Sequence, residues 1–163
     1  MPVHFEPAEM EIRRHQVSKR LSELGLDGLL MFKQESMYYL TGYDTFGFGM
    51  FQCLIIDGSG HTVLLTRLPD LRQAQFTSDI QDIRLWHDTE DVNPALELRG
   101  LLDDLGYRNK TLGIEFDSYG LKAHYWRLLE PQLDGFCRLV DASTLVDQFR
   151  RVKSLTEIEY IRR

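Results

Sequence analysis

Residues 36–52 read SMYYLTGYDTFGFGMFQ and place six aromatic side chains around three glycines, between two segments that are typical of core strands. Glycine permits backbone angles that other residues avoid, and an aromatic ring supplies a large contact area at a low cost in entropy. This combination predicts a loop flexed by its glycines, and two interpretations of its rings follow. The rings either cover the end of a sheet, which is the commoner use of buried aromatic residues, or they line a pocket.

The composition of the 163 residues is that of an ordinary globular protein, with 43% hydrophobic and 27% charged residues. This length fits one domain with its own core, or a domain with a short appendage. The net charge of −6 argues against nucleic acid or an anionic membrane as the main partner. No apolar run reaches transmembrane length, and the N-terminal segment lacks the apolar core of a signal peptide. Cys53 and Cys137 lie in apolar surroundings and are expected to be reduced thiols of a cytoplasmic protein.

Hydrophobic periodicity predicts helices that alternate with strands. Helices are expected at residues 7–24, 94–105 and 145–149, with a further helix capped by Asp117 or Ser118 and stopped by Pro131. Strands are expected at residues 28–32, 53–57, 62–66, 83–86, 111–115 and 138–141, and Gly58-Ser59-Gly60 joins two of them in a hairpin. Residues 67–77 are ambiguous, with a short helix expected after Pro69. The fold class is therefore α/β, one domain in which a mixed sheet of about five to six strands, including the hairpin, is flanked by helices.

The end of the sequence is a second informative segment. Ser154-Leu155-Thr156-Glu157 has the form of a capping box, and Ile158 and Ile161 begin an apolar stripe behind it. Helices average about three turns, whereas this one has under two before Arg163. A helix that is capped in this way and then stops so early predicts that something longer follows in the natural protein.

Catalytic and metal-binding patterns are sparse. The five histidines are scattered, with no His-x-x-x-His or Cys-x-x-Cys spacing. His87-Asp88-Thr89-Glu90-Asp91 is better interpreted as a solvated turn than as a metal site, because adjacent loop residues rarely converge on one ion. Arg67 follows a buried strand and could reach an anionic group at its end, although a local salt bridge is the simpler interpretation. The residues alone thus predict an α/β domain without a catalytic or metal centre of its own.

Three segments of the chain resemble the non-catalytic N-terminal domain of the creatinase/prolidase/aminopeptidase P family of pita-bread metallohydrolases. They are RRHQVSKRLSELGLDG at residues 13–28, YYLTGY at residues 38–43 and RVKSLTEIEYIRR at residues 151–163. The last is similar to the R-x-K-[ST]-x-x-E-[IL]-x-x-[IL]-[RK] pattern with which the family's catalytic domain begins. The order of the expected elements also fits, so the likeness spans nearly the whole chain.

The resemblance implies an N-terminal domain at residues 1–150 and the first helix of a C-terminal pita-bread domain at residues 151–163. In that family the second domain holds two divalent metal ions (manganese, cobalt or zinc), which activate a water for attack on an amide-type carbon, although creatinase itself works without metal. Because the matching segment is absent, no catalytic residue, metal or cofactor is expected in this chain. The full protein is expected to be a cytoplasmic hydrolase of C–N bonds in a small amide or peptide, and this chain alone is expected to be inactive.

The resemblance also implies a role for the aromatic segment. In the family this domain helps to form a homodimer, and its loop leans over the mouth of the partner's active site. The substrate-pocket loop would here consist of Tyr43, Asp44, Thr45, Phe46, Phe48, Phe51 and Arg67. Its aromatic residues look more like those of the creatinase and ectoine-hydrolase branches than those of strict Xaa-Pro peptidases. Tyr39 and Leu40, by contrast, are expected to face the core.

Two other hypotheses come from different classes. The aromatic segment at residues 36–52 and the lack of catalytic residues are also typical of a stand-alone α/β module that binds a ligand or another protein without catalysing a reaction. An enzyme that uses His87, Glu90 and Asp91 with a bound metal is a third hypothesis, weakened by the poor spacing of these ligands.

Overall fold

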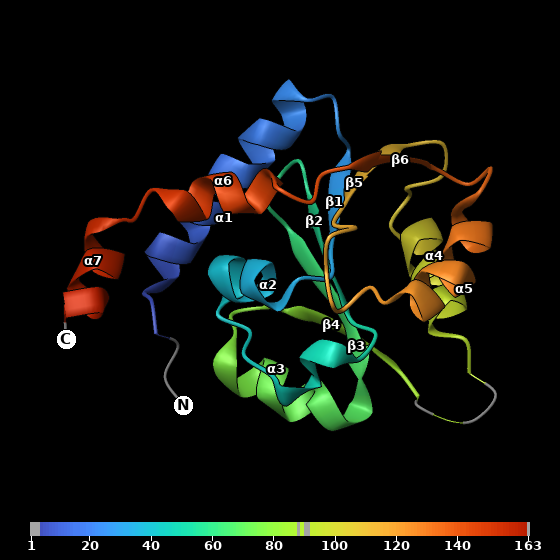
Figure 1. Cartoon of the computed structure of the whole chain (residues 1–163), viewed down its shortest axis with the longest axis horizontal. Coiled ribbons are helices and arrows are strands. Elements are labelled where there is room, and N and C mark those ends of the chain that lie inside the picture. Colours follow the sequence, from blue (N-terminus) through green and yellow to red (C-terminus); the bar gives the residue numbers. More distant parts are fainter. Residues whose placement is uncertain (1–3, 88, 90–91, 163) are drawn as a thin grey trace.

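In the computed structural model, which describes residues 4–87, 89 and 92–162, the hairpin lies in the middle of a six-stranded mixed sheet (Figure 1). It consists of the antiparallel strands β2 (Cys53–Asp57) and β3 (Thr62–Arg67). On one side β4 (Asp82–Trp86) runs parallel to β3, and on the other lie β1 (Gly28–Met31), β5 (Thr111–Ile114) and β6 (Arg138–Asp141). Since β1 is antiparallel to β2 whereas β5 and β6 continue in parallel, the predicted α/β class with a mixed sheet is confirmed.

Helices cover both faces of the sheet (Figure 1). One face carries α1 (Pro7–Glu23), α2 (Gln34–Thr41), α3 (Leu71–Thr77) and α6 (Leu145–Arg151). The opposite face carries α4 (Pro94–Asp104) and α5 (Ala123–Leu133). Two short 3-10 turns, Phe46–Gly49 and Leu68–Asp70, follow α2 and β3, and α7 (Leu155–Arg162) lies at the edge of the molecule.

Two hydrophobic layers hold the helices against the sheet. Because successive strand residues point to opposite faces, Ile55 packs in the layer of α4 and α5, while its neighbours Leu54 and Ile56 pack in the layer of α1 and α2. All three side chains are buried, which explains why the sequence of β2 is continuously apolar from Cys53 to Ile56. Cys53 is buried beside Ile55, and both cysteines of the chain are free.

The first part of the aromatic segment is helical, so the prediction of a loop there is wrong. α2 ends at Gly42, whose φ of 77° is the left-handed conformation that closes many helices. Met37 and Leu40 are buried three residues apart on one face of this helix. Tyr39 and Leu40 lie in the core, as expected. The true loop therefore comprises residues 43–51, and we refer to it as the aromatic loop.

α5 begins and ends later than the sequence indicates. Neither Asp117 nor Ser118 caps it, because the Ser118 hydroxyl oxygen instead accepts a hydrogen bond from the Gly120 N–H within the preceding loop. Pro131 lies inside the helix rather than at its end. A proline inside a helix removes its own backbone donor and crowds the carbonyl four residues earlier, which bends a helix without always ending it, and α5 continues to Leu133.

The capping box at the start of α7 is confirmed. The Ser154 N–H donates to Glu157 Oε2 (2.8 Å), and the Glu157 N–H donates to Ser154 Oγ (3.2 Å). The domain boundary at residue 150 stays a prediction. Within the described part of the chain, no helix combines the length and apolar character needed to cross a membrane.

Candidate functional site

Buried hydrogen bonds hold the aromatic loop in place at both of its ends. The Tyr43 hydroxyl donates to Gln52 Oε1 (2.5 Å), which also accepts from the Thr66 hydroxyl (2.8 Å). The amide of Gln52 in turn donates to the carbonyl oxygen of Gly47 (2.7 Å). Burial raises the pKa of Tyr43 to about 12, so its hydroxyl stays protonated and remains a donor. This network ties the loop to β3.

A second anchor joins the loop to the segment that follows β3. Asp70 is buried, and its carboxylate accepts a hydrogen bond from the Thr45 hydroxyl (3.0 Å) and pairs with Arg67 (2.9 Å). Thr45 Oγ1 also accepts from the Gly47 N–H (2.9 Å). The local salt bridge foreseen for Arg67 is therefore confirmed, and its partner belongs to the anchor of the aromatic loop.

The residues of the expected substrate-pocket loop divide into an inner and an outer group. Tyr43 and Phe51 are fully buried in the core, so neither side chain reaches the surface of this chain. Asp44, Phe46 and Phe48 point outward, with Phe46 91% and Phe48 52% exposed. Contact of these outer residues with a substrate stays a prediction.

We expect Gly47→Ala to destabilise the aromatic loop. A Cβ atom at this position would lie 2.5 Å from Asp70 Oδ1 and 2.7 Å from Gln52 Nε2. Since hydrogen bonds fix both of these side chains, they cannot move aside without loss, and the free energy of unfolding should fall by about 1–3 kcal/mol. Urea denaturation measures this change.

The matched control is Gly49→Ala in the same turn. The nearest atom to a Cβ there would be Lys122 Nζ, at 3.7 Å, so this variant should keep its stability. Equal stability of the two variants would show that the anchor of the aromatic loop is weak.

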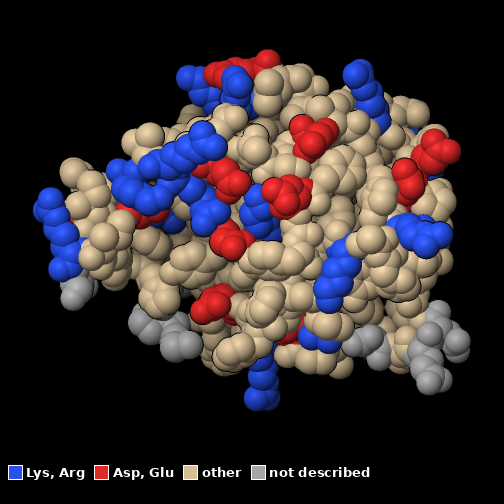
Figure 2. Space-filling model, viewed as in Figure 1, with Lys and Arg blue, Asp and Glu red and all other residues tan. Residues whose placement is uncertain are grey.

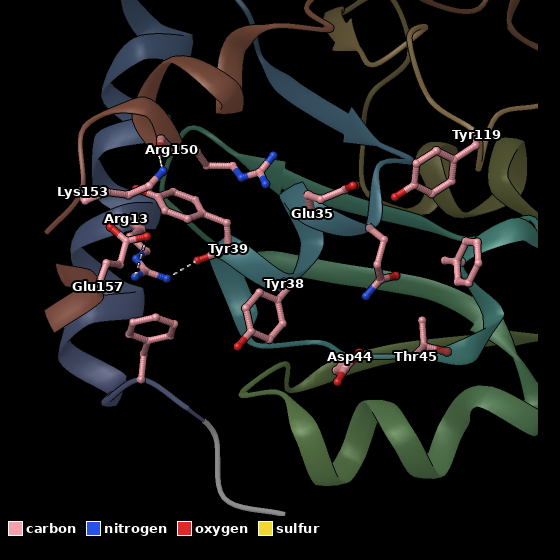
Figure 3. Close-up of a pocket in the computed structure, with 13 residues that line it drawn as sticks. Arg13, Glu35, Tyr38, Tyr39, Asp44, Thr45, Tyr119, Arg150, Lys153 and Glu157 are labelled. Carbon is pink, nitrogen blue, oxygen red and sulfur yellow. Dashed lines mark hydrogen bonds and ion pairs between the residues drawn. The ribbon is translucent and has the colours of Figure 1, made fainter. Parts of the chain in front are cut away.

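Beside the loop lies a hollow of about 550 Å³, within the usual range of ligand pockets (Figure 3). It is bordered by α1, α2, the aromatic loop and the junction of α6 and α7, and we refer to it as the hollow. Its lining consists of Phe5, Arg13, Gln34, Glu35, Tyr38, Tyr39, Asp44, Thr45, Phe48, Tyr119, Arg150, Lys153 and Glu157.

The lining of the hollow combines rings with charges of both signs. The rings of Phe48 and Tyr119 meet edge to face with their centroids 5.7 Å apart. Burial, and then a hydrogen bond to the Glu35 carboxylate, raises the pKa of Tyr119 to about 12. Figure 2 shows basic side chains gathered over α6 and α7, the side of the hollow that Arg150 and Lys153 occupy. Such a surface suits a ligand or protein partner that carries both an apolar group and a charged group.

Glu115 is fully buried at the end of β5 and fixes the start of α2. Its Oε2 accepts hydrogen bonds from the backbone N–H groups of Phe32 (3.1 Å) and Lys33 (2.9 Å). Its Oε1 accepts from the Ser36 hydroxyl (2.5 Å). Burial raises the pKa of Glu115 to about 7, although the Ser36 hydroxyl and the Lys33 ammonium favour the charged form. The carboxylate thereby sets the position of the α2 residues that line the hollow.

Nothing in the described part of the chain offers a metal site: no three His, Cys, Asp or Glu side chains gather there to hold an ion. Asp88, Glu90 and Asp91 of the acidic segment lie outside the described residues. The expected lack of a metal and of catalytic residues in this chain therefore stays a prediction.

Sequence reasoning missed Arg13, Glu35 and Glu115 as site residues. A signal for Arg13 existed, because it follows Met10 by three residues on the buried stripe of α1. A charged side chain on such a stripe must find partners inside the protein. Glu115 directly follows an apolar strand, which suggests burial, but its partners on α2 carry no recognisable pattern.

The fold can now be compared with known proteins. Residues 13–152 match the model of the creatinase/prolidase N-terminal domain family. This match covers most of the chain, and the chain therefore belongs to that family.

Among curated proteins, the ectoine hydrolase of Halomonas elongata is 30% identical over 165 residues, which cover 97% of this chain and 41% of that protein. The chain spans 41% and 42% of the curated relatives that it matches.

Two solved structures show the same fold. The prolidase of Thermococcus sibiricus has a TM-score of 0.74 at 19% identity, over 90% of this chain and 38% of that one. The N-terminal domain of the cytoplasmic peptidase PepQ of Mycobacterium tuberculosis has a TM-score of 0.65 at 22% identity, over 86% of this chain and 99% of that one. At these identities the comparison concerns the fold alone.

Proposed function

We propose that this chain is the non-catalytic N-terminal domain of a hydrolase that cleaves a C–N bond in a small amide or peptide. Its family membership supports this, as does the similarity to an ectoine hydrolase that is more than twice as long as the matched region. The catalytic centre, with two divalent metal ions (manganese, cobalt or zinc), would belong to a C-terminal pita-bread domain. The described residues of this chain do not fit a metal, so we derive no step through a metal here.

Within such an enzyme, the aromatic loop would form part of the mouth of the substrate pocket. The observation that carries this proposal is the exposure of Phe46 and Phe48 on a loop that buried hydrogen bonds hold in one shape. Exposed rings on a fixed backbone offer contact area without a further loss of backbone entropy on binding. The loop would thus act by contact with the substrate rather than by making bonds.

The dimeric state and the cell compartment belong to the same proposal. We propose a cytoplasmic homodimer in which the loop of one subunit faces the active site of the other. The two cysteines, which are both free thiols, support the compartment. Analytical ultracentrifugation of the longer protein tests the dimer, and a monomer at micromolar concentration would contradict it.

The test of the hydrolase proposal compares this chain with the product of its gene read past Arg163. The chain alone should show no amide hydrolysis with added manganese or cobalt, and the longer protein should show turnover. Activity of the isolated chain that disappears on mutation of one of its own residues would overturn the proposal. A stop codon directly after Arg163 would instead favour a stand-alone binding module.

Phe48→Ala in the longer enzyme should change the Michaelis constant or the substrate preference more than the stability. The ring lines the hollow and is half exposed, so truncation removes contact area at the surface and leaves no core cavity. Leu96→Ala on α4 is the control, since it truncates a side chain of similar exposure (53%) on the opposite face of the sheet. A large loss of melting temperature with unchanged kinetics would show that Phe48 is structural.

A further inference from the structure

The three segments that resemble the family motifs meet at one guanidinium group. Arg13 lies on α1 and is only 3% exposed. It donates a hydrogen bond to the carbonyl oxygen of Tyr39 on α2 (2.9 Å). It also pairs with Glu157 on α7 (3.5 Å) and with Glu9 one turn away on its own helix (3.1 Å). Figure 3 shows Arg13, Tyr39 and Glu157 facing one another at one end of the hollow.

Aromatic rings complete the surroundings of Arg13. Its guanidinium carbon lies 4.1 Å from the ring centre of Phe5 and 4.4 Å from that of Tyr39. Phe5 also meets the ring of Tyr160 on α7, with centroids 5.3 Å apart. The hydroxyl of Tyr160 donates to the carbonyl oxygen of His4 (2.6 Å). The N-terminal residues and α7 are thus joined to the same cluster.

α7 depends on these contacts because it places no side chain in either hydrophobic layer of the core. No residue of this helix is buried, and Leu155 and Ile161 are 81% and 70% exposed. A helix of eight residues is also too short to be stable by itself. The position of α7 therefore rests on a few polar and aromatic contacts, among which the pair with Arg13 is the least exposed to water.

We propose that Arg13 and Glu157 are positioning residues whose ion pair fixes α7 relative to α2 and the hollow. This inference rests on the proposed function, in which α7 leads into the catalytic domain. α7 begins after residue 152, where the match to the N-terminal domain family ends. The ion pair would thus set the direction in which the chain leaves the domain.

The Glu157 carboxylate both caps α7 and pairs with Arg13, one oxygen for each contact. Glu157 Oε2 accepts a hydrogen bond from the Ser154 N–H and so stabilises the start of α7. Glu157 Oε1 faces Arg13 and so holds α7 against α1. Because the same guanidinium holds the Tyr39 carbonyl, a shift of α7 would be transmitted to α2. The start of α7 and its placement are therefore coupled.

The first experiment compares Glu157→Gln with Glu159→Gln by amide hydrogen exchange of this chain. A glutamine at position 157 can still complete the capping box, but it removes the charge that faces Arg13. Glu159 is exposed on the same helix, so its variant makes the same change in net charge. We expect exchange of the α7 amides to become about three- to tenfold faster in Glu157→Gln and to stay unchanged in Glu159→Gln.

The second readout is the Nε–H resonance of Arg13, which a general loss of helix would not shift selectively. It should move in Glu157→Gln and remain in place in Glu159→Gln. Equal exchange rates and equal Arg13 resonances in the two variants would overturn the inference. Neither result depends on catalysis, so a failure here is distinct from a failure of the proposed function, which the comparison of this chain with the longer protein would reveal.

Discussion

Glu115→Leu should lower the free energy of unfolding by about 2–4 kcal/mol, because the N–H groups of Phe32 and Lys33 would lose their buried acceptor. The Ser36 hydroxyl would lose its partner as well. Leucine fills part of the space but offers no acceptor, so the loss comes from unpaired donors and not from a cavity alone. Urea denaturation of this chain near pH 6 measures the effect.

Glu115→Gln is the matched control, since its side-chain oxygen can still accept a hydrogen bond. This variant should retain most of the unfolding free energy of the natural chain. It should also remove the part of the pH dependence of that free energy that comes from the titration of Glu115. Burial raises the folded-state pKa of Glu115 from 4.5 to about 7. Between these values the unfolded carboxyl has released its proton and the folded one has kept it. The contribution of this group to stability is therefore fully present below about pH 4.5 and is lost as the pH rises to about 7.

The difference in unfolding free energy between the natural chain and Glu115→Gln isolates this effect from other titrating groups. Relative to Glu115→Gln, the natural chain should lose about 3 kcal/mol of unfolding free energy between pH 4.5 and pH 7. Parallel stability profiles of the two proteins over this window would contradict the raised pKa. A fully stable Glu115→Leu would contradict the role of the carboxylate at the start of α2.

Gly120→Ala should lower the free energy of unfolding more than alanine at Gly47, Gly49 or Gly100. A Cβ atom there would lie 2.2 Å from the backbone carbonyl oxygen of Phe32, which cannot rotate away as a side chain can. Either the loop before α5 or the end of β1 must move, at a cost of about 1–3 kcal/mol or more. Thermal and urea denaturation of the variant would both show the loss.

The control for Gly120→Ala is Gly100→Ala on α4. Nothing lies within 4 Å of a Cβ at Gly100, and the residue lies inside a helix. Alanine should therefore raise the free energy of unfolding by about 0.5–1 kcal/mol through its higher helix propensity. The two glycine variants should thus change stability in opposite directions. A change of the same sign in both would show that the close approach at Gly120 is relieved without cost.

Most of the fold could be predicted because its signals are local. The central strands β1, β2 and β3 contain short apolar runs, and Gly58-Ser59-Gly60 marks the hairpin. α2 was missed because its tyrosines are typical of strands and loops and because it has only eight residues. Such a short helix is stable only where tertiary contacts hold it, here through Glu115 at its start and Arg13 on its Tyr39 carbonyl.

The candidate site was predicted in part. The sequence located the aromatic loop, but it could not separate the exposed rings of Phe46 and Phe48 from the buried rings of Tyr43 and Phe51. All four are aromatic residues within one short loop, and burial depends on what lies behind each ring. Tyr43 is inside because its hydroxyl finds a partner in Gln52, a contact that the loop composition does not indicate.

The sequence by itself determined the alternation of strands and helices, the hairpin, the capping box and the likeness to the creatinase/prolidase N-terminal domain. Each of these depends on neighbouring residues or on a motif with fixed spacing. Only the tertiary structure decided that Arg13, Tyr39 and Glu157 meet, and that a buried carboxylate holds α2. The physical reason is that the sheet places α1, α2 and α6 on one face, and α7 follows α6, so that charges far apart in the chain come within contact distance.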